Sequence, residues 1–263
     1  MNKTKIEWCD FTFNPIVGCT NGCSYCYARR MAARGLWGCD KCKAFTPHLH
    51  PERIGEPEKL RKPARIFVCS MGEIFDPAIG VHDTQYVIGR AAWPSTNQRH
   101  LFLILTKQSQ IGYERLHGKE GSYWFGGGDY LPNVWVGASV DGVDQGVTDY
   151  RCERLHRLAG NGWHTFLSAE PLLGEVLLHG DPRCAACPQW LIIGAQTGPG
   201  ATPPKREWVD GLLKQAEALE MPVFLKDNLL RLFPDLPRLR WLPPMPEVAQ
   251  FLLRAPACEE RTR

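Results

Sequence analysis

The chain has 263 residues, of which 44% are hydrophobic and 22% are charged, with a formal net charge of +3 at pH 7. This composition excludes disordered and fibrous chains, and the length suits one large α/β domain. The charge is too small to identify a nucleic-acid partner. The polar N-terminal stretch has no secretory signal pattern, and no apolar run is long enough to cross a membrane, so we expect no membrane partner.

The chain contains 11 cysteines. Without a secretory signal, so many thiols argue against a disulfide framework. They favour metal or redox chemistry in a reducing compartment, so we expect a cytoplasmic protein.

The first strand is predicted near Trp8 to Phe13, where apolar and polar residues alternate. A loop follows with the spacing Cys19-x3-Cys23-x2-Cys26, and Tyr25 stands directly before the last cysteine. Three thiolates can hold three irons of a cubane iron–sulfur cluster and leave the fourth iron open for a small molecule. The alternatives are three packed thiols or part of a zinc site, but structural zinc needs four ligands and no fourth donor follows closely.

This spacing, with its aromatic residue, resembles the signature of the radical S-adenosylmethionine (SAM) superfamily. In that superfamily, the amino and carboxylate groups of SAM chelate the open iron, and an electron from the cluster cleaves SAM to a 5′-deoxyadenosyl radical. The resemblance implies a 4Fe-4S cluster on Cys19, Cys23 and Cys26, with Tyr25 near the cofactor. It also implies an electron donor such as a flavodoxin or a ferredoxin.

After the loop, short apolar runs alternate with helical patterns, which predicts βαβ units and a parallel sheet. Strands are predicted over residues 65–69, 101–105, 134–139, 165–168, 190–194 and 222–225, and helices over 27–34, 83–93, 108–117, 148–159 and 208–219. We therefore expect an α/β fold, a partial or complete TIM-like barrel of about six to seven parallel strands. The barrel domain should span residues 1–232. A proline-rich tail, 233–263, with one short helix over 247–253, should pack on it or trail from it.

Polar residues follow six of the predicted strands, at the end where barrel enzymes carry their chemistry. They are Ser70 and Glu73, Thr106 and Lys107, Ser139 and Asp141, Ser168 and Glu170, Gln196 and Thr197, and Lys226 and Asn228. Any one of them can be turn or capping chemistry. Together with the cysteine loop, which follows the first strand, they predict one site at the carboxyl ends of the strands.

Met71-Gly72-Glu73 resembles the Gly-Gly-Glu stretch that binds the SAM amino group in the superfamily, with Met71 in place of the first glycine. The resemblance implies that the Glu73 carboxylate pairs with the ammonium group. Ser139 and Gln196 are candidates for the ribose or carboxylate of SAM.

Three ionisable residues are candidates for catalysis. Lys107 and Lys226 could bind a phosphate or carboxylate of SAM or substrate. Glu170 could act as an acid or base, or could orient the substrate.

The chain also resembles an uncharacterised phage-encoded family with radical-SAM character. The resemblance is carried by residues 5–8, 14–15, 18–19, 23–28, 105–107, 134–137, 167–174 and 190–194, and the run Glu170-Pro171-Leu172-Leu173-Gly174 is its most distinctive part. It implies a barrel, the cluster and SAM, in the host cytosol if the protein is phage-encoded. Phage radical-SAM proteins that hypermodify thymine suggest DNA as a partner, with modification or isomerisation of a modified DNA base.

Two other functions stay open from the sequence. One is radical SAM chemistry on a small molecule or peptide. The other is a non-enzymatic, zinc-bearing nucleic-acid-binding protein in which all cysteines are structural. Salt-dependent DNA binding and metal content separate these hypotheses.

A second set of cysteines stands in two Cys-x2-Cys pairs, Cys39 with Cys42 and Cys184 with Cys187. Four thiolates suit a structural zinc ion, which would join two irregular segments. An auxiliary iron–sulfur cluster or unrelated thiols are the alternatives. Both pairs precede predicted strands, so we expect them away from the carboxyl ends of the sheet.

Overall fold

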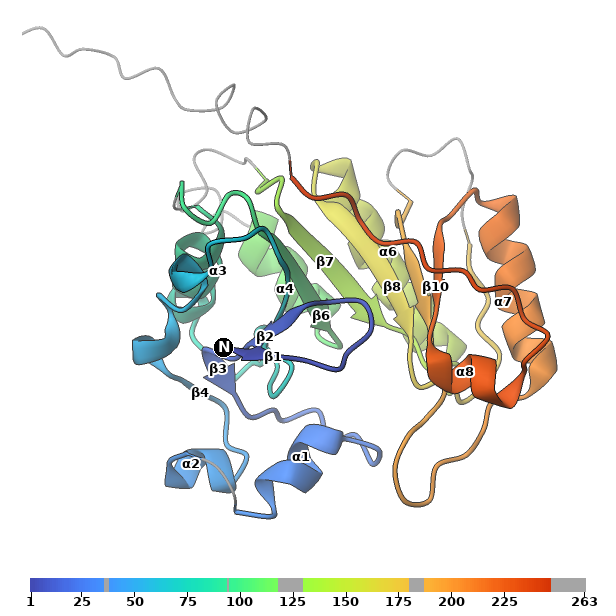
Figure 1. Cartoon of the computed structure of the whole chain (residues 1–263), viewed down its shortest axis with the longest axis horizontal. Helices are drawn as coiled ribbons and strands as arrows, with labels where there is room; N and C mark the ends of the chain where they lie inside the picture. Colours follow the sequence, from blue (N-terminus) through green and yellow to red (C-terminus); the bar gives the residue numbers. More distant parts are fainter. Residues whose placement is uncertain (36–37, 94, 118–129, 180–186, 247–263) are drawn as a thin grey trace, which may run out of the picture.

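The computed structural model describes residues 1–35, 38–93, 95–117, 130–179 and 187–246. Within these residues the main sheet has eight strands, in the order β1-β2-β5-β6-β7-β8-β9-β10 (Figure 1). Strand β1 is antiparallel to β2, and all other neighbours are parallel. The predicted α/β fold with a parallel sheet is therefore confirmed.

The elements alternate along the chain as the hydrophobic pattern predicts. The strands are β1 (Asn2–Lys3), β2 (Phe11–Phe13), β3 (Ile16–Val17), β4 (His48–Leu49), β5 (Arg65–Val68), β6 (Leu101–Thr106), β7 (Val134–Ser139), β8 (His164–Ala169), β9 (Leu191–Ile193) and β10 (Val223–Leu225). The helices are α1 (Tyr27–Ala32), α2 (Asp40–Lys43), α3 (Val81–Ala92), α4 (Ser109–His117), α6 (Gln145–Gly160), α7 (Arg206–Ala218) and α8 (Asp227–Leu232), with 3₁₀ turns η1 (Pro51–Arg53) and η2 (Pro57–Lys59).

The main sheet is open, with β1 and β10 as its edge strands. The parallel strands follow one another in chain order, as they do in a barrel, but no ladder joins the two edges in the described residues. A closed barrel is thus not shown. None of the described helices combines the length and the apolar character that a membrane span requires.

The two faces of the sheet bury different kinds of side chain. One face packs against α3, α4, α6 and α7 through aliphatic residues such as Val87, Leu155 and Leu212. The other face carries a layer rich in aromatic residues, including Trp135 and Trp190. Burial of both faces explains why the parallel strands read as continuous apolar runs in the sequence.

The segment 233–246 runs across the sheet in Figure 1, and its residues Leu242 and Met245 pack against the aromatic layer. Leu225 N donates to Leu239 O at 2.9 Å, and Trp241 N donates to Val223 O at 3.2 Å. The Trp241 ring lies 6.1 Å from that of Trp190. This part of the predicted tail is therefore packed on the sheet, and the helix predicted over 247–253 lies outside the described residues.

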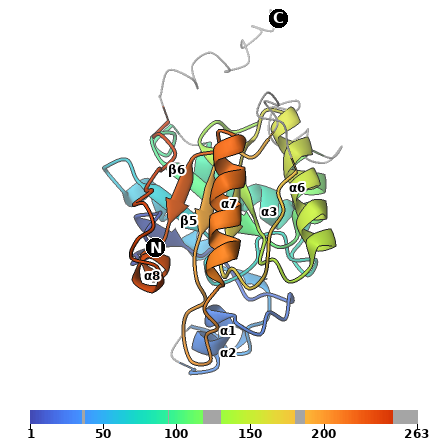
Figure 2. The ribbon, with the colours of Figure 1, turned by 90° about the vertical axis from the view of Figure 1, so that its right-hand side faces the viewer.

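Residues between β2 and β5 form a small layer of their own. Strands β3 and β4 pair as an antiparallel two-stranded sheet. Helices α1 and α2 lie side by side at one end of the molecule in both views (Figures 1 and 2). An isolated parallel bridge between Gly18 and Gly72 joins this layer to the chain just after β5, so it lies at the carboxyl end of the main sheet.

Candidate functional site

The loop with three cysteines connects β3 to α1, and two of its thiols shape it. The Sγ atom of Cys19 accepts a hydrogen bond from Asn21 N at 3.3 Å. Cys26 caps α1, and its Sγ atom accepts from Arg29 N at 3.4 Å. The guanidinium of Arg29 returns to Cys19 O at 2.9 Å, which ties the two ends of the loop together.

Apolar side chains pack below this loop. Cys19 and Cys26 contact a small buried cluster that includes Phe45 and Met71. Burial, with smaller contributions from nearby acidic side chains, raises the pKa of the Cys19 thiol to about 12. A bound metal cation would therefore have to displace the Cys19 proton.

The segment Met71-Gly72-Glu73 packs directly against the base of the loop. Gly18 N donates to Met71 O at 3.1 Å, and Glu73 N donates to Gly18 O at 3.1 Å. A Cβ atom on Gly72 would lie 2.9 Å from Gly18 O, so a side chain there would push the two segments apart. The sequence prediction placed these residues beside the cofactor, and the structure places them beside the cysteine loop.

The Glu73 carboxylate is buried, with 4% of the residue exposed. It accepts from Thr106 Oγ1 at 2.7 Å, Lys107 N at 3.0 Å, Phe75 N at 3.2 Å and Asn21 Nδ2 at 3.3 Å. Burial outweighs these donors and raises its pKa. In this structure its oxygens accept four hydrogen bonds from the protein, so Glu73 supports the loop, and its pairing with a SAM ammonium group stays a prediction.

A second buried carboxylate, Asp76, holds the loop from the same side. Its Oδ2 atom accepts from Thr20 N at 2.7 Å and from Thr20 Oγ1 at 2.9 Å. The sequence did not identify Asp76 as a site residue, because it stands several positions after the end of β5 and not directly at the strand end.

An open cavity of about 560 Å³ lies beside the cysteine loop. Its lining residues are Asn21, Cys23, Ser24, Tyr25, Lys107, Gln108, Asp141, Val143, Val147, Tyr150, Arg151 and Leu173. The cavity thus brings together one of the three cysteines, the aromatic residue of the motif, and polar groups from the ends of β6 and β7. Its size suits a nucleotide-sized ligand.

A hydrogen-bonded trio lies on the wall of this cavity. Lys107 Nζ donates to the Tyr25 hydroxyl at 2.6 Å, and that hydroxyl donates to Asp141 Oδ2 at 2.7 Å. Lys107 Nζ also lies 3.4 Å from Asp141 Oδ2. Burial opposes ionisation of Asp141, but the hydrogen bond from Tyr25 and the charge of Lys107 outweigh it and lower its pKa.

Glu170 and Lys226 form an ion pair across the ends of β8 and β10. Gly194, at the end of β9, lies between them, and a Cβ atom there would lie 2.9 Å from Lys226 Cδ and 3.0 Å from a Glu170 carbon. Burial raises the pKa of Glu170 despite the nearby lysine charge. Two residues that the sequence proposed separately are therefore direct partners.

The remaining predicted ligands lie elsewhere. Ser139 is buried at the end of β7 and is not among the residues that line the cavity. The Gln196 side chain accepts from Thr202 N at 2.9 Å, which closes its own loop. The structure therefore does not bring either residue into the wall beside Cys23.

Comparison with known families gives the affiliation of the chain. The family model described as "Protein of unknown function (DUF5131)" matches residues 3–228. The chain belongs to this family. The matched range contains the cysteine loop and all the described parallel strands. No curated protein and no solved structure matches the chain.

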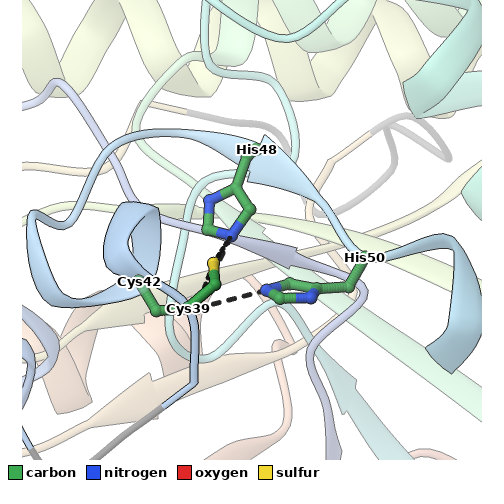
Figure 3. A group of neighbouring side chains, drawn as sticks. All are labelled: Cys39, Cys42, His48 and His50. Atoms are coloured by element: carbon green, nitrogen blue, oxygen red, sulfur yellow. Dashed lines mark hydrogen bonds between the residues drawn. The ribbon is translucent and has the colours of Figure 1, made fainter.

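In the part of this DUF5131 protein that the structure describes, four Cys and His side chains form a group that could hold a metal ion. The ligand atoms of Cys39, Cys42, His48 and His50 all lie within 4.8 Å of one another (Figure 3). The two histidines were missed, although the spacing Cys-x2-Cys-x5-His-x-His, in which all four ligands come from one short loop, is a usable signal.

The pairing of Cys39 and Cys42 with Cys184 and Cys187 at one zinc ion stays a prediction, and the structure describes three of these four cysteines. Cys187 lies just before β9, and lines a hollow with Cys152 and Met221. Cys39 and Cys42 lie in the layer at the carboxyl end of the sheet, where Cys19 N donates to Phe45 O at 3.4 Å. Cys39 and Cys42 are therefore close to the cysteine loop and at the end of the sheet opposite to Cys187, so the expectation that this first pair lies away from the carboxyl ends is wrong. Cys184 lies outside the described residues.

Proposed function

We propose that this DUF5131 protein is a radical SAM enzyme, with a 4Fe-4S cluster on Cys19, Cys23 and Cys26. The observation that carries the proposal is the position of the cysteine loop. It follows the first parallel strand, and it shares a nucleotide-sized cavity with polar residues from two later strand ends. The chain order of the parallel strands supports the partial-barrel form of the fold.

The residues around the loop suit an iron–sulfur cluster. The three cysteines are half-buried and free, with apolar cover beneath Cys19 and Cys26. Low solvent access stabilises and tunes such clusters. Cys19, Cys23 and Cys26 would supply three thiolates, one fewer than the four irons of the cluster. This donor set supports a cluster with one open iron.

When bound, the cluster and SAM supply an electron and a carbon-centred radical. The chain's own residues bind and orient. Lys107 is positioned to donate to the carboxylate of SAM, and Asp141 to accept from its ammonium or ribose hydroxyl groups. Tyr25 holds both side chains in place through its hydroxyl.

The Glu170 and Lys226 pair serves the substrate side of the site. A carboxylate with a raised pKa beside an ammonium group can accept or return a proton at a substrate atom.

For the substrate, we extend the proposal to a modified DNA base, with modification or isomerisation as the reaction. Basic side chains of α1 and of the turn after it support a polyanionic partner, since Arg29 and Arg34 are exposed. Duplex DNA binding measured across a salt series tests this extension. Affinity that falls steeply with salt supports it, and a flat response favours a small molecule or peptide as substrate.

Iron content and SAM cleavage test the main proposal. Anaerobically purified protein should contain about four irons per chain and cleave SAM on reduction. Cys23→Ala should lose both properties, whereas Cys152→Ala, a half-buried cysteine outside the loop, should keep both. SAM cleavage that persists in Cys23→Ala would overturn the assignment.

The second candidate function is a zinc-bearing nucleic-acid-binding protein without catalysis. The group of Cys39, Cys42, His48 and His50 favours it. Metal analysis decides: zinc without iron in anaerobic protein supports this candidate, and iron bound through the cysteine loop excludes it.

We extend the proposal to a cytosolic location, because an oxygen-sensitive cluster and reduced thiols persist in a reducing compartment. The electron donor would be a flavodoxin or ferredoxin of the same compartment. Eight of the described cysteines, those from Cys9 to Cys152, form no disulfide bond.

A further inference from the structure

We propose that Cys39, Cys42, His48 and His50 bind one Zn²⁺ ion in a closed tetrahedral site. The two sulfur atoms lie 3.8 Å apart. The Nε2 atom of His48 lies 3.3 Å from Cys39 Sγ and 3.5 Å from Cys42 Sγ, and the Nε2 atom of His50 lies 3.2 Å from Cys42 Sγ. An ideal zinc tetrahedron has edges of about 3.8 Å between sulfurs and about 3.5 Å between sulfur and nitrogen.

Local structure brings the four ligands together (Figure 3). Cys39 is the N-cap of α2 and Cys42 stands three positions later, so both side chains lie on one side of the turn. His48 and His50 are two positions apart along β4 and its continuation, which puts both rings on one face. Gly38 has a positive φ of 48°, and a Cβ atom there would lie 3.0 Å from Cys42 Sγ.

Hydrogen bonds to the outer ring nitrogens fix the histidine tautomers. His48 Nδ1 lies 2.7 Å from Thr46 O, which can only accept, so Nδ1 carries the proton. His50 Nδ1 lies 2.8 Å from a Glu52 carboxylate oxygen. Both Nε2 atoms therefore present lone pairs to the thiols. Metal-binding histidines are commonly oriented by such a carboxylate or carbonyl partner.

The geometry favours a single zinc ion over an iron–sulfur cluster. Two thiolates and two imidazoles also bind a [2Fe–2S] centre, but there the thiolates and the imidazoles sit on different irons. Here each histidine nitrogen is within 3.5 Å of a sulfur, as expected for ligands of one ion. Mixed nitrogen and sulfur donors in a tetrahedron suit Zn²⁺.

The site is structural, because four protein ligands leave no position for a substrate. It fixes the chain that follows α2. Phe45, three residues after Cys42, has a positive φ of 54°, and its ring lies under Arg29 at 4.9 Å. Its carbonyl accepts from Cys19 N at 3.4 Å. By fixing the segment that contains Phe45, the zinc ion would also fix the carbonyl group that accepts the hydrogen bond from Cys19 N.

Zinc content and X-ray absorption of the tag-free protein test the proposal. We expect one zinc per chain, with two sulfur neighbours at about 2.3 Å and two nitrogen neighbours at about 2.0–2.1 Å. Four sulfur neighbours would restore the pairing with Cys184 and Cys187. That result, or protein without zinc after incubation with Zn²⁺, would overturn the proposal.

Variants give the second readout. His50→Ala and Cys42→Ser should bind Zn²⁺ at least tenfold more weakly, whereas His117→Ala, an exposed histidine on α4, should bind it as the wild type does. Substitution of Co²⁺ for zinc checks the ligand set in the wild-type protein, even if a variant does not fold. The absorption spectrum should show thiolate charge-transfer bands and the d–d bands of tetrahedral Co²⁺. The d–d bands of octahedral Co²⁺ would contradict the site.

A variant with Cys19, Cys23 and Cys26 replaced by Ala should still hold one zinc per chain. This separates the zinc site from the proposed radical SAM function, since either can fail without the other. Loss of zinc in this variant would show that the ion belongs to the cysteine loop.

Discussion

At the scale of single residues, the site depends on partly buried charges that stabilise one another. Asp141 stays ionised because the Tyr25 hydroxyl and the Lys107 ammonium group contact the same oxygen. Its lowered pKa means that the folded state gains from ionisation. That stabilisation is fully present above the pKa of the unfolded chain, near 3.8, and is lost as the pH falls through the lower folded pKa.

Asp141→Asn should therefore lower the free energy of unfolding by about 1–2 kcal/mol at pH 7, because a charged hydrogen-bond acceptor is removed. The difference from the wild type should shrink as the pH falls below about 4. Urea denaturation of both proteins at a series of pH values measures it. A difference that is constant with pH would contradict the role of the ionised carboxylate.

Tyr25→Phe removes the hydroxyl that joins Lys107 to Asp141. If these side chains bind SAM, the affinity for SAM should fall by about tenfold, the loss of one charge-assisted hydrogen bond. Calorimetric titration of anaerobic, cluster-loaded protein measures the Kd. Tyr86→Phe, an exposed tyrosine on α3, is the matched control and should leave the Kd unchanged. Equal affinities for all three proteins would remove Tyr25 from the binding site.

At the scale of elements, a buried arginine holds the segment between β5 and α3. Arg115 of α4 donates to Thr84 Oγ1 at 2.9 Å and to the carbonyl oxygens of Ile79 and Asp76 at 2.6 and 3.1 Å. The same segment carries the Asp76 carboxylate that holds Thr20 in the cysteine loop. A helix on one face of the sheet thus supports the loop at the sheet's end.

Arg115→Met should cost about 2–4 kcal/mol of stability, because it leaves several buried acceptors without donors. Arg90→Met is the control, since Arg90 forms an exposed pair with Glu58, and its replacement should cost less than about 0.5 kcal/mol. Chemical denaturation compares the two variants. A loss for Arg115→Met no larger than that of the control would show that the segment does not depend on this clamp.

Zinc removal is the second prediction at this scale. Stripping the ion with a chelator should lower the Tm and increase proteolysis within residues 38–50, because four ligands fix this short segment. If the cysteine loop carries a cluster, the protein should also retain less iron after zinc removal, because Phe45, whose carbonyl accepts from Cys19 N, is no longer fixed. An unchanged Tm after complete zinc removal would contradict a structural role.

Elements with strong hydrophobic patterns could be predicted from the sequence, and those held by side-chain chemistry could not. The apolar run predicted over 134–139 is β7 residue for residue. Helix α6 begins earlier than predicted because Asp144 caps it by accepting from Val147 N at 3.1 Å. Helix α2 and strand β4 were missed, because they are too short for a periodic pattern and converge on a proposed metal site.

The candidate site could also be predicted in part, where its residues belong to a local sequence pattern. The cysteine spacing and the polar strand ends identified Tyr25 and Lys107, which do meet, and Glu170 and Lys226, which form a pair. The saturation of Glu73 by four donors depends on tertiary contacts with Asn21, Phe75, Thr106 and Lys107 that no local pattern encodes.

At the scale of the whole molecule, the segment 233–246 completes the aromatic face of the sheet. Leu242 and Met245 pack against the buried layer, and Arg65 donates to Pro243 O at 3.0 Å. A chain that ends at residue 232 should therefore be insoluble or bind a hydrophobic dye, whereas one that ends at residue 246 keeps every contact described above. A soluble, dye-negative 1–232 fragment would contradict this role of the segment.

The most direct test of the central claim is electron paramagnetic resonance of the reduced, anaerobic protein with and without SAM. The account predicts the signal of a reduced 4Fe-4S cluster that changes shape when SAM is added, because the ligand binds the iron that no cysteine holds. Cys23→Ala should lack the signal. A protein that assembles no cluster, or a cluster whose signal is unchanged by saturating SAM, would contradict the account.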